Sequence, residues 1–410
     1  MESILVSLGK YLDVKRQASP RLFFLGNSEV LTLVTTSSIE KMTSILTKVF
    51  MHVAKIDCHE NDGGEGESTY TSNNFQRLRI YGLIGEDGDS IQFQRHIQYN
   101  SSFENLINQI VDSMKTTVKD AIAASIPGCQ SGSFVDWAMT TPTYIAYIAL
   151  NAVFCNEMED CFAAYESNPR AFQQYEAIMK RRIEDATDSF LMPLSSRDKY
   201  KLNVILTELL GFRDRFRLAT EKLQNHSPYL EWLNSLRFRF LPNSTSIQVE
   251  FADVKLDHGY EYWGKTPILI HTPTIDACLS DCIYSLNQNQ LPMITASASS
   301  AKQIIGKTLA CLFGQFTYIV RPFPDMSEYF ISKILTGVVS TGALAIFSGI
   351  EHLSYKSLSF LFDNVHSIIS SIESGSSRIT ISNRISDLNK HCRVLLTSDS
   401  NFMSYGNIPP

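Results

Sequence analysis

The stretch between residues 292 and 314 constrains the fold more than any other part of the chain. A short apolar run, Pro292–Thr295, is followed by small residues, then by Lys302, and then by apolar residues at helical spacing. This order is typical of a phosphate-binding loop between a strand and a helix, G-x-x-x-x-G-K-[ST], whose glycines let backbone N–H groups surround phosphates. The stretch therefore predicts an α/β domain with a loop of this kind.

The loop itself departs from the ideal pattern. Its lysine is Lys302, but both motif glycines are replaced, by Ala296 and Ala301, and the hydroxyl residue that would hold Mg²⁺ is replaced by Gln303. Alanine resists the positive-φ geometry that glycine adopts freely, and its Cβ crowds a phosphate. Lys302 can be read as a phosphate ligand or as a helix-start lysine that reaches solvent, and the lost glycines favour the second interpretation.

Composition narrows the class of protein. The chain has 410 residues, of which 44% are hydrophobic and 19% charged, with a net charge of −6. These values are ordinary for a globular protein with two or three domains and predict no nucleic-acid partner. The longest apolar runs are too short for a transmembrane helix, so no membrane is expected. The eight cysteines form no CxxC pair and predict reduced thiols rather than a metal site.

The pattern of apolar residues changes near residue 243. Before it, helical spacing dominates, as in Ile39–Ile56, and a β-hairpin is predicted near 75–98 around the turn Gly85–Gly88. After it, short apolar runs alternate with helices, which is typical of a doubly wound α/β domain. The runs predicted as strands are 247–251, 268–270, 292–295, 316–320, 343–347 and 394–397. We therefore predict a multidomain α and α/β protein with domains 1–243 and 244–410.

Six segments along the chain carry a series of distinctive phrases: Ser19–Leu31, Gly82–Asp89, Leu194–Asp198, Arg213–Asp214, Trp232–Phe240 and His258–Cys278. In order and spacing, these phrases resemble those of dynein heavy chains. They cover the C-terminal part of the linker and most of the first AAA+ module of that family. The resemblance implies an elongated helical-bundle linker followed by a P-loop-type AAA+ domain, incomplete at its C-terminus, in which nucleotide hydrolysis swings the linker.

The resemblance also assigns positions to the catalytic parts. The family's loop GPAGTGKT falls on residues 296–303, which makes Ser300, Ala301, Lys302 and Gln303 the nucleotide-loop residues. Its two motif acids fall on Ser348 and Gly349, and its sensing Asn falls on Asp399. The phrase on the adenine side falls on Thr272 and Pro273.

These replacements predict a retained fold without hydrolysis. The family acids order Mg²⁺ and polarise the attacking water, and neither Ser348 nor Gly349 carries a charge. An acid at position 399 would repel a γ-phosphate. Phosphoryl transfer depends on positioning and electrostatics from all of these parts together. We expect no catalytic residue, no metal and no bound cofactor here, whereas the family uses ATP or ADP with Mg²⁺.

Three functions remain open at this stage. The favoured one is a structural or regulatory role in a microtubule or ciliary dynein-type assembly, as a pseudo-ATPase. The alternatives are a module that binds nucleotide without hydrolysis and a piece of an active motor ATPase. The resemblance implies partners among dynein-related heavy, intermediate or light chains, and the rest of an AAA+ ring if the chain is a fragment. It also implies a cytoplasmic location, at the cytoskeleton or in a cilium or axoneme.

Overall fold

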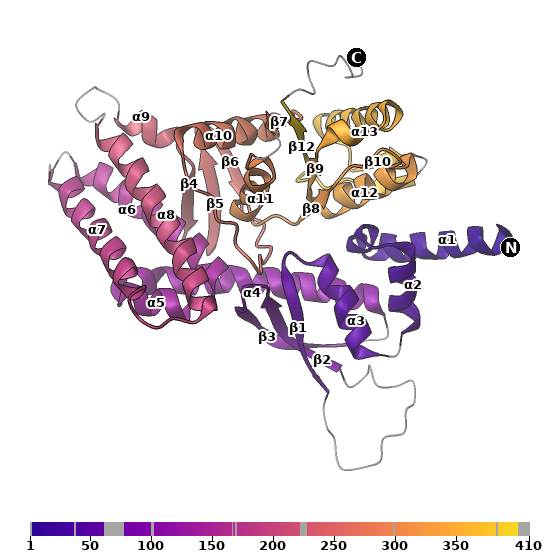
Figure 1. Cartoon of the computed structure of the whole chain (residues 1–410), viewed down its shortest axis with the longest axis horizontal. Helices are drawn as coiled ribbons and strands as arrows, with labels where there is room; N and C mark the ends of the chain where they lie inside the picture. Colours follow the sequence, from indigo (N-terminus) through magenta and orange to yellow (C-terminus); the bar gives the residue numbers. More distant parts are fainter. Residues whose placement is uncertain are drawn as a thin grey trace, which may run out of the picture.

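In the computed structural model, residues 2–400 are described except for 37, 61–77, 100–101, 166, 169, 222–227, 298–299 and 383. Two parts follow each other along the chain (Figure 1): an N-terminal region, α1 to α9, and a C-terminal module, α10 to β12. A small antiparallel sheet connects them. The predicted fold class is confirmed, because a mostly helical region precedes an α/β domain with a parallel sheet.

The N-terminal region begins with short helices and a three-stranded sheet. These elements are α1 (Glu2–Ala18), η1 (Pro20–Phe24), α2 (Asn27–Thr35), α3 (Ile39–Leu46), η2 (Thr47–Val49), β1 (Val53–Glu60), β2 (Leu78–Gly85) and β3 (Ser90–Gln98). The sheet is antiparallel in the order β1-β2-β3. The helix expected over residues 39–56 is therefore wrong in its second half, because residues from Val53 onward pair with β2. Residues 75–77 of the predicted hairpin lie outside the described residues.

Long helices make up the rest of the N-terminal region. They are α4 (Phe103–Ser131), α5 (Phe134–Thr140), α6 (Thr143–Ala164), α7 (Ala171–Ser189), α8 (Ser196–Glu221) and α9 (Pro228–Leu233). Pro142 separates α5 from α6, since the residue before a proline avoids the helical conformation. Helix α6 is buried along most of its length, so it is the central helix of this region.

The connecting sheet consists of β4 (Arg237–Leu241), β5 (Ser246–Phe251) and β6 (Val254–Asp257). Its strands are antiparallel neighbours in chain order. The run 247–251, predicted as part of the doubly wound sheet, thus lies in a separate sheet, because it pairs with β4 and β6 through hairpin turns. The boundary predicted between residues 243 and 244 falls in the turn between β4 and β5.

The C-terminal module is built on a four-stranded parallel sheet in the order β7-β12-β9-β8. Its elements are α10 (Pro273–Asn287), β7 (Met293–Ala296), α11 (Lys302–Leu312), β8 (Thr317–Val320), α12 (Glu328–Thr341), β9 (Leu344–Ser348), η5 (Ile350–His352), α13 (Tyr355–Glu373), β10 (Arg378–Ile381), β11 (Arg384–Asp387) and β12 (Arg393–Asp399). The run 268–270, predicted as a strand, has no regular structure, and Ile270 is 72% exposed.

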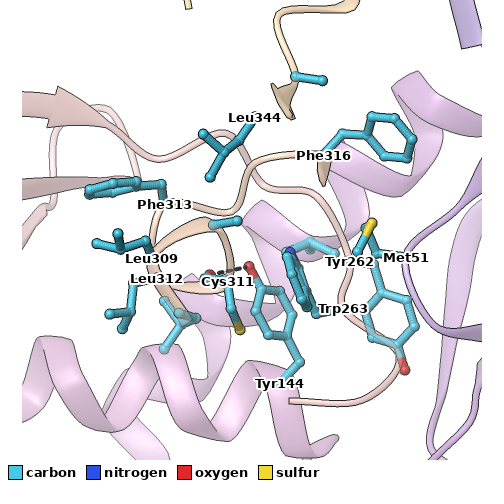
Figure 2. Close-up of a cluster of buried hydrophobic side chains, with 14 of the residues drawn as sticks. Met51, Tyr144, Tyr262, Trp263, Leu309, Cys311, Leu312, Phe313, Phe316 and Leu344 are labelled. Carbon is cyan, nitrogen blue, oxygen red and sulfur yellow. Dashed lines mark hydrogen bonds between the residues drawn. The ribbon is translucent and has the colours of Figure 1, made fainter. Parts of the chain in front are cut away.

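One hydrophobic core joins the two parts. Buried side chains from Leu12 to Leu396 belong to a single cluster. Figure 2 shows the section where Tyr144 of α6 and Trp263 meet Leu309 and Leu312 of α11. The Tyr144 hydroxyl donates a hydrogen bond to the carbonyl oxygen of Cys311, 3.4 Å away. The parallel sheet is therefore supported by side chains of the N-terminal region as well as by its own helices.

Candidate functional site

The predicted catalytic positions meet at the carboxyl edge of the parallel sheet. Strand β12 lies between β7 and β9, with Asp399 in register with Ala296 and Thr397 in register with Ser348. Because the carboxyl ends of parallel strands share one edge, the loop after β7, the end of β9 and the end of β12 come together there. The ends of these strands therefore bring the described positions 296–297, 300–303, 348–349 and 399 to one edge of the sheet.

Lys302 is the first residue of α11, and its ammonium group contacts its own loop. The Nζ atom donates to the carbonyl oxygen of Ala296 at 2.5 Å and to that of Ser297 at 2.9 Å. Ala301 occupies the N-cap position, and no side chain caps the helix there. Ser300 is exposed, and Gln303 is partly exposed. Ala298 and Ser299 of the predicted loop lie outside the described residues.

The end of β9 has an unusual backbone. Gly349 adopts φ +93°, in the left-handed region that favours glycine, and its N–H donates to the carbonyl oxygen of Thr397 at 2.9 Å. A Cβ atom at this position would lie 3.2 Å from Cδ2 of His352 and 3.5 Å from Oε1 of Glu351. The space beside Gly349 is thus already bordered by two side chains of η5.

Two carboxylates lie near this edge. Asp399, at the end of β12, accepts a hydrogen bond from the hydroxyl of Ser400 at 3.2 Å. Glu351 follows β9, and its Oε2 atom is buried with no hydrogen-bond partner in the described part of the chain. Within that part, no group of three or more His, Cys, Asp or Glu residues could hold a metal ion. Mg²⁺ in nucleotide sites is usually held by one or two carboxylates together with phosphate oxygens and water, and the positions of the two family acids here are Ser348 and Gly349.

Thr272 and Pro273, the positions of the family's adenine-side phrase, lie at the start of the C-terminal module. They begin α10, where the Thr272 side chain accepts a hydrogen bond from the backbone N–H of Ile275 at 3.3 Å. Both residues line a cavity of about 530 Å³ between α8, α9 and α10. None of the described residues between 293 and 303 lines this cavity.

The same cavity contains a charged cluster that the sequence did not suggest. His271 pairs with Asp276 at 2.7 Å and with Glu208 of α8 at 3.8 Å. Burial lowers the pKa of His271, but hydrogen bonds to Asp276 and Glu208 outweigh it and raise the pKa to about 9. Glu208 and His271 are far apart in the sequence, so only the short spacing from His271 to Asp276 could have pointed to the cluster.

A second buried pair connects the start of the chain to the segment before α10. Arg21 makes a two-pronged contact with Glu261, with N–O distances of 2.8 and 2.6 Å. Its guanidinium also donates to the carbonyl oxygen of Val49 at 2.9 Å and stacks over the ring of Phe316, 4.4 Å from the centroid. Such geometry fixes orientation as well as adding attraction.

None of the helices in the described residues is long and apolar enough to cross a membrane.

Comparison with known proteins places both parts in one family. Residues 1–125 match the family described as "Dynein heavy chain, N-terminal region 2". Residues 258–410 match the family described as "Hydrolytic ATP binding site of dynein motor region".

Individual relatives agree. The chain is 23% identical over 355 residues to a ciliary dynein beta chain of Tripneustes gratilla. The aligned region covers 86% of this chain and 8% of the relative. It is 25% identical over 378 residues to the human dynein axonemal heavy chain 10, and here the aligned region covers 90% of this chain and 8% of the relative. It is also 22% identical over 419 residues to a cytoplasmic dynein heavy chain of Caenorhabditis elegans, over 98% of this chain and 9% of the relative. The chain therefore spans less than a tenth of the length of these relatives. With two matched regions in the family's order and a parallel sheet of the expected topology, the chain belongs to the dynein heavy chain family and comprises its linker region and first AAA module.

Proposed function

We propose that this chain is a non-hydrolysing linker and AAA+ module with a structural or regulatory role in a dynein-type assembly. The main support comes from the carboxyl edge of the sheet, where the loop glycines, both motif acids and the sensing Asn are all replaced. Transition-state stabilisation in phosphoryl transfer needs metal, loop and water-positioning groups together. The loss of all these groups removes far more transition-state stabilisation than the change of a single side chain would.

The contacts of Lys302 add a second argument. Its ammonium group offers three donors, and two of them are directed at carbonyl oxygens of its own loop. A phosphate would have to compete with these bonds and would meet Cβ atoms where the loop of the family pattern has glycines. The loop is therefore stabilised by its own lysine, which suits a module that keeps its fold without nucleotide.

The setting of this role is proposed from the relatives. Several of them are named as ciliary or axonemal dynein chains. We infer a location at the cytoskeleton or in a cilium, and partners among other dynein chains. The shared core and the buried pairs between the two parts would present such partners with a fixed arrangement of linker and module.

Isothermal titration calorimetry with ATP and with ADP, each with and without Mg²⁺, tests this function when it is paired with a phosphate-release assay. We expect no heat of binding and no phosphate release above buffer. Micromolar binding without phosphate release would support the nucleotide-binding alternative and make Lys302 the first residue to replace. Binding with steady turnover would overturn the proposal.

A further inference from the structure

A separate cavity lies at the amino edge of the parallel sheet. Its volume is about 520 Å³, within the range of about 300–1,000 Å³ that is common for small-molecule sites. Phe316 lines it just before β8, Gly342 just before β9 and Arg393 at the start of β12. Helix α4 and the end of β6 complete the wall. The degenerate phosphate loop follows β7 at the opposite, carboxyl edge, so the two places are distinct.

Arg393 is a partly buried cation of this wall. Its Nη1 atom donates to the carbonyl oxygens of Lys390 at 2.7 Å and of Cys392 at 3.0 Å. Its Nε and Nη2 atoms have no hydrogen-bond partner among the described residues, and neither atom is sealed from solvent. Burial lowers the pKa of Arg393, and no carboxylate of the described residues counters that loss of hydration. An anionic ligand would supply the missing partner.

The free donors of Arg393 form one edge of its guanidinium group. The Nε–H and one N–H of Nη2 point in parallel, at the spacing of the two oxygens of a carboxylate. The guanidinium of Arg21, which also lines the cavity, already makes a two-pronged contact with Glu261 at 2.8 and 2.6 Å. The wall thus holds one guanidinium paired with a carboxylate of the protein and another, Arg393, whose carboxylate-binding edge is open.

The rest of the wall decides what kind of anion fits. Buried or partly buried apolar side chains cover part of it, namely Leu256, Leu286, Phe313 and Phe316, the last two of which are labelled in Figure 2. Four further ionisable side chains of the wall are exposed, so water and salt screen them; they are Asp112, Lys115, Asp257 and His391. Since two of these four are acidic, the cavity suits a single negative charge better than a double one.

We propose that this cavity binds a small monocarboxylate with an apolar body. Its carboxylate would accept hydrogen bonds from Nε and Nη2 of Arg393, and its body would cover the apolar wall. Because α4 belongs to the N-terminal region and β12 to the C-terminal module (Figure 1), an occupant would add contacts between the two parts of the chain. The proposal does not depend on the phosphate loop, so it stands whether or not the chain binds nucleotide.

A suitable probe is 3-phenylpropionate, and 3-phenylpropanamide, which has nearly the same shape without the charge, is its matched control. Saturation-transfer NMR with the full chain should detect the acid with a dissociation constant in the millimolar range, as expected for a ligand of this size. The amide should bind at least about tenfold more weakly, because it offers one neutral acceptor oxygen instead of two charged ones. Equal affinities of acid and amide would overturn the proposal, as would the absence of saturation transfer from the acid.

A first pair of variants tests the role of Arg393. Arg393→Gln should weaken binding of the acid by about tenfold or more, the usual effect of losing hydrogen bonds to a charged group. The matched control is Lys390→Gln, which removes an exposed positive charge three residues earlier, outside the cavity wall, and should leave the affinity unchanged. Equal losses in the two variants would show a general effect of charge and would contradict the assignment of Arg393.

A second pair tests the location of the site. Asn108 is an exposed residue of α4 that lines the cavity, and Asn108→Trp should weaken binding about tenfold by filling the space. Asn105→Trp, one turn earlier on the same helix and outside the wall, should leave the affinity unchanged. Wild-type affinity in Asn108→Trp would place the ligand elsewhere. If Arg393→Gln does not fold, the two probes and the two asparagine variants still decide the proposal.

Discussion

Charged side chains serve different purposes at the contact between the two parts and at the carboxyl edge of the parallel sheet. At the contact, Arg21 pairs with Glu261, and Lys333 of α12 donates to the carbonyl oxygen of Leu25. At the edge, Lys302 bonds only to carbonyl oxygens of its own loop, and no ion pair joins the three strand ends in the described part of the chain. The buried charges of Arg21, Glu261 and Lys333 thus hold separate segments of the chain together, whereas Lys302 contacts its own loop.

The contrast also concerns what each region tolerates. A buried ion pair adds little net stability compared with apolar side chains, but removing one partner leaves an unpaired charge in the interior. The edge lies at the surface, where single replacements away from special backbone positions usually change stability little. The contact between the parts should therefore be sensitive to single substitutions, and the edge should be tolerant.

The largest effect is expected from Arg21→Ala. Arg21 and Glu261 are both almost fully buried, so the variant leaves the Glu261 carboxylate unpaired and should lower the free energy of unfolding by about 3–5 kcal/mol. Urea unfolding followed by circular dichroism measures this loss. The double variant Arg21→Leu, Glu261→Leu should recover most of it, because no buried charge remains.

An exposed pair provides the control for that experiment. Lys180 and Glu184 are 3.8 Å apart on α7 with exposed side chains, so Lys180→Ala should leave the unfolding midpoint almost unchanged. Equal losses in Arg21→Ala and Lys180→Ala would remove the distinction between the contact and the surface.

The second effect is a dependence of folding stability on pH. It arises where His271, just before α10, meets Glu208 of α8. The pKa of His271 is raised from 6.5 to about 9, so its stabilising contribution is complete below pH 6.5 and is lost as the pH rises through 9. The shift corresponds to at most about 3 kcal/mol. Thermal unfolding between pH 6 and 10 should show this decline in the wild type and a flatter profile in His271→Gln.

A histidine outside the cluster supplies the matched comparison. His366 is exposed on α13, and His366→Gln should keep the decline of the wild type. If His271→Gln and the wild type lose stability in parallel as the pH rises, the cluster does not hold the two helices together.

A third, smaller effect concerns close packing. Gly337 of α12 lies against η1, and a Cβ atom added there would come within 2.7 Å of the Cβ of Phe23 and 3.1 Å of the Phe24 ring. Gly337→Ala should therefore destabilise by about 1–2 kcal/mol, since overpacking exceeds the gain in helix propensity. Gly9→Ala in α1, where no atom lies within 4 Å of the added Cβ, should instead stabilise slightly. Denaturant midpoints of the two variants should move in opposite directions.

The sequence predicted the edge of the sheet better than the contact between the parts. The predicted runs 292–295, 316–320, 343–347 and 394–397 coincide with β7, β8, β9 and β12 to within two residues at each end, because parallel strands are buried on both faces and appear as continuous apolar runs. Since such strands end at one edge, the replaced catalytic positions could be placed together before the structure was known.

The contact between the parts could not be predicted in the same way. Glu208 and His271 meet where the segment before α10 passes α8, and Arg21 meets Glu261 across most of the chain, so no local pattern marks either pair. Strand β1 was missed for a similar reason: its partner β2 begins 18 residues after β1 ends, at Leu78, and helical spacing upstream extended the predicted helix into it.

The last prediction concerns the carboxyl edge of the parallel sheet and expects no gain in ATP hydrolysis. Ser348→Asp with Gly349→Glu restores both family acids, but phosphate release should stay at the level of buffer, because the loop still lacks its glycines and Asp399 still holds the sensor position. The backbone adds a further obstacle, since a glutamate at position 349 must adopt φ +93° or shift the chain next to His352. Measurable turnover in this double variant would show that two acids suffice, and the edge would then be a silenced active site. If turnover appears only after Ala296→Gly, Ala301→Gly and Gln303→Thr are added, the phosphate loop is the part whose loss decides the chemistry.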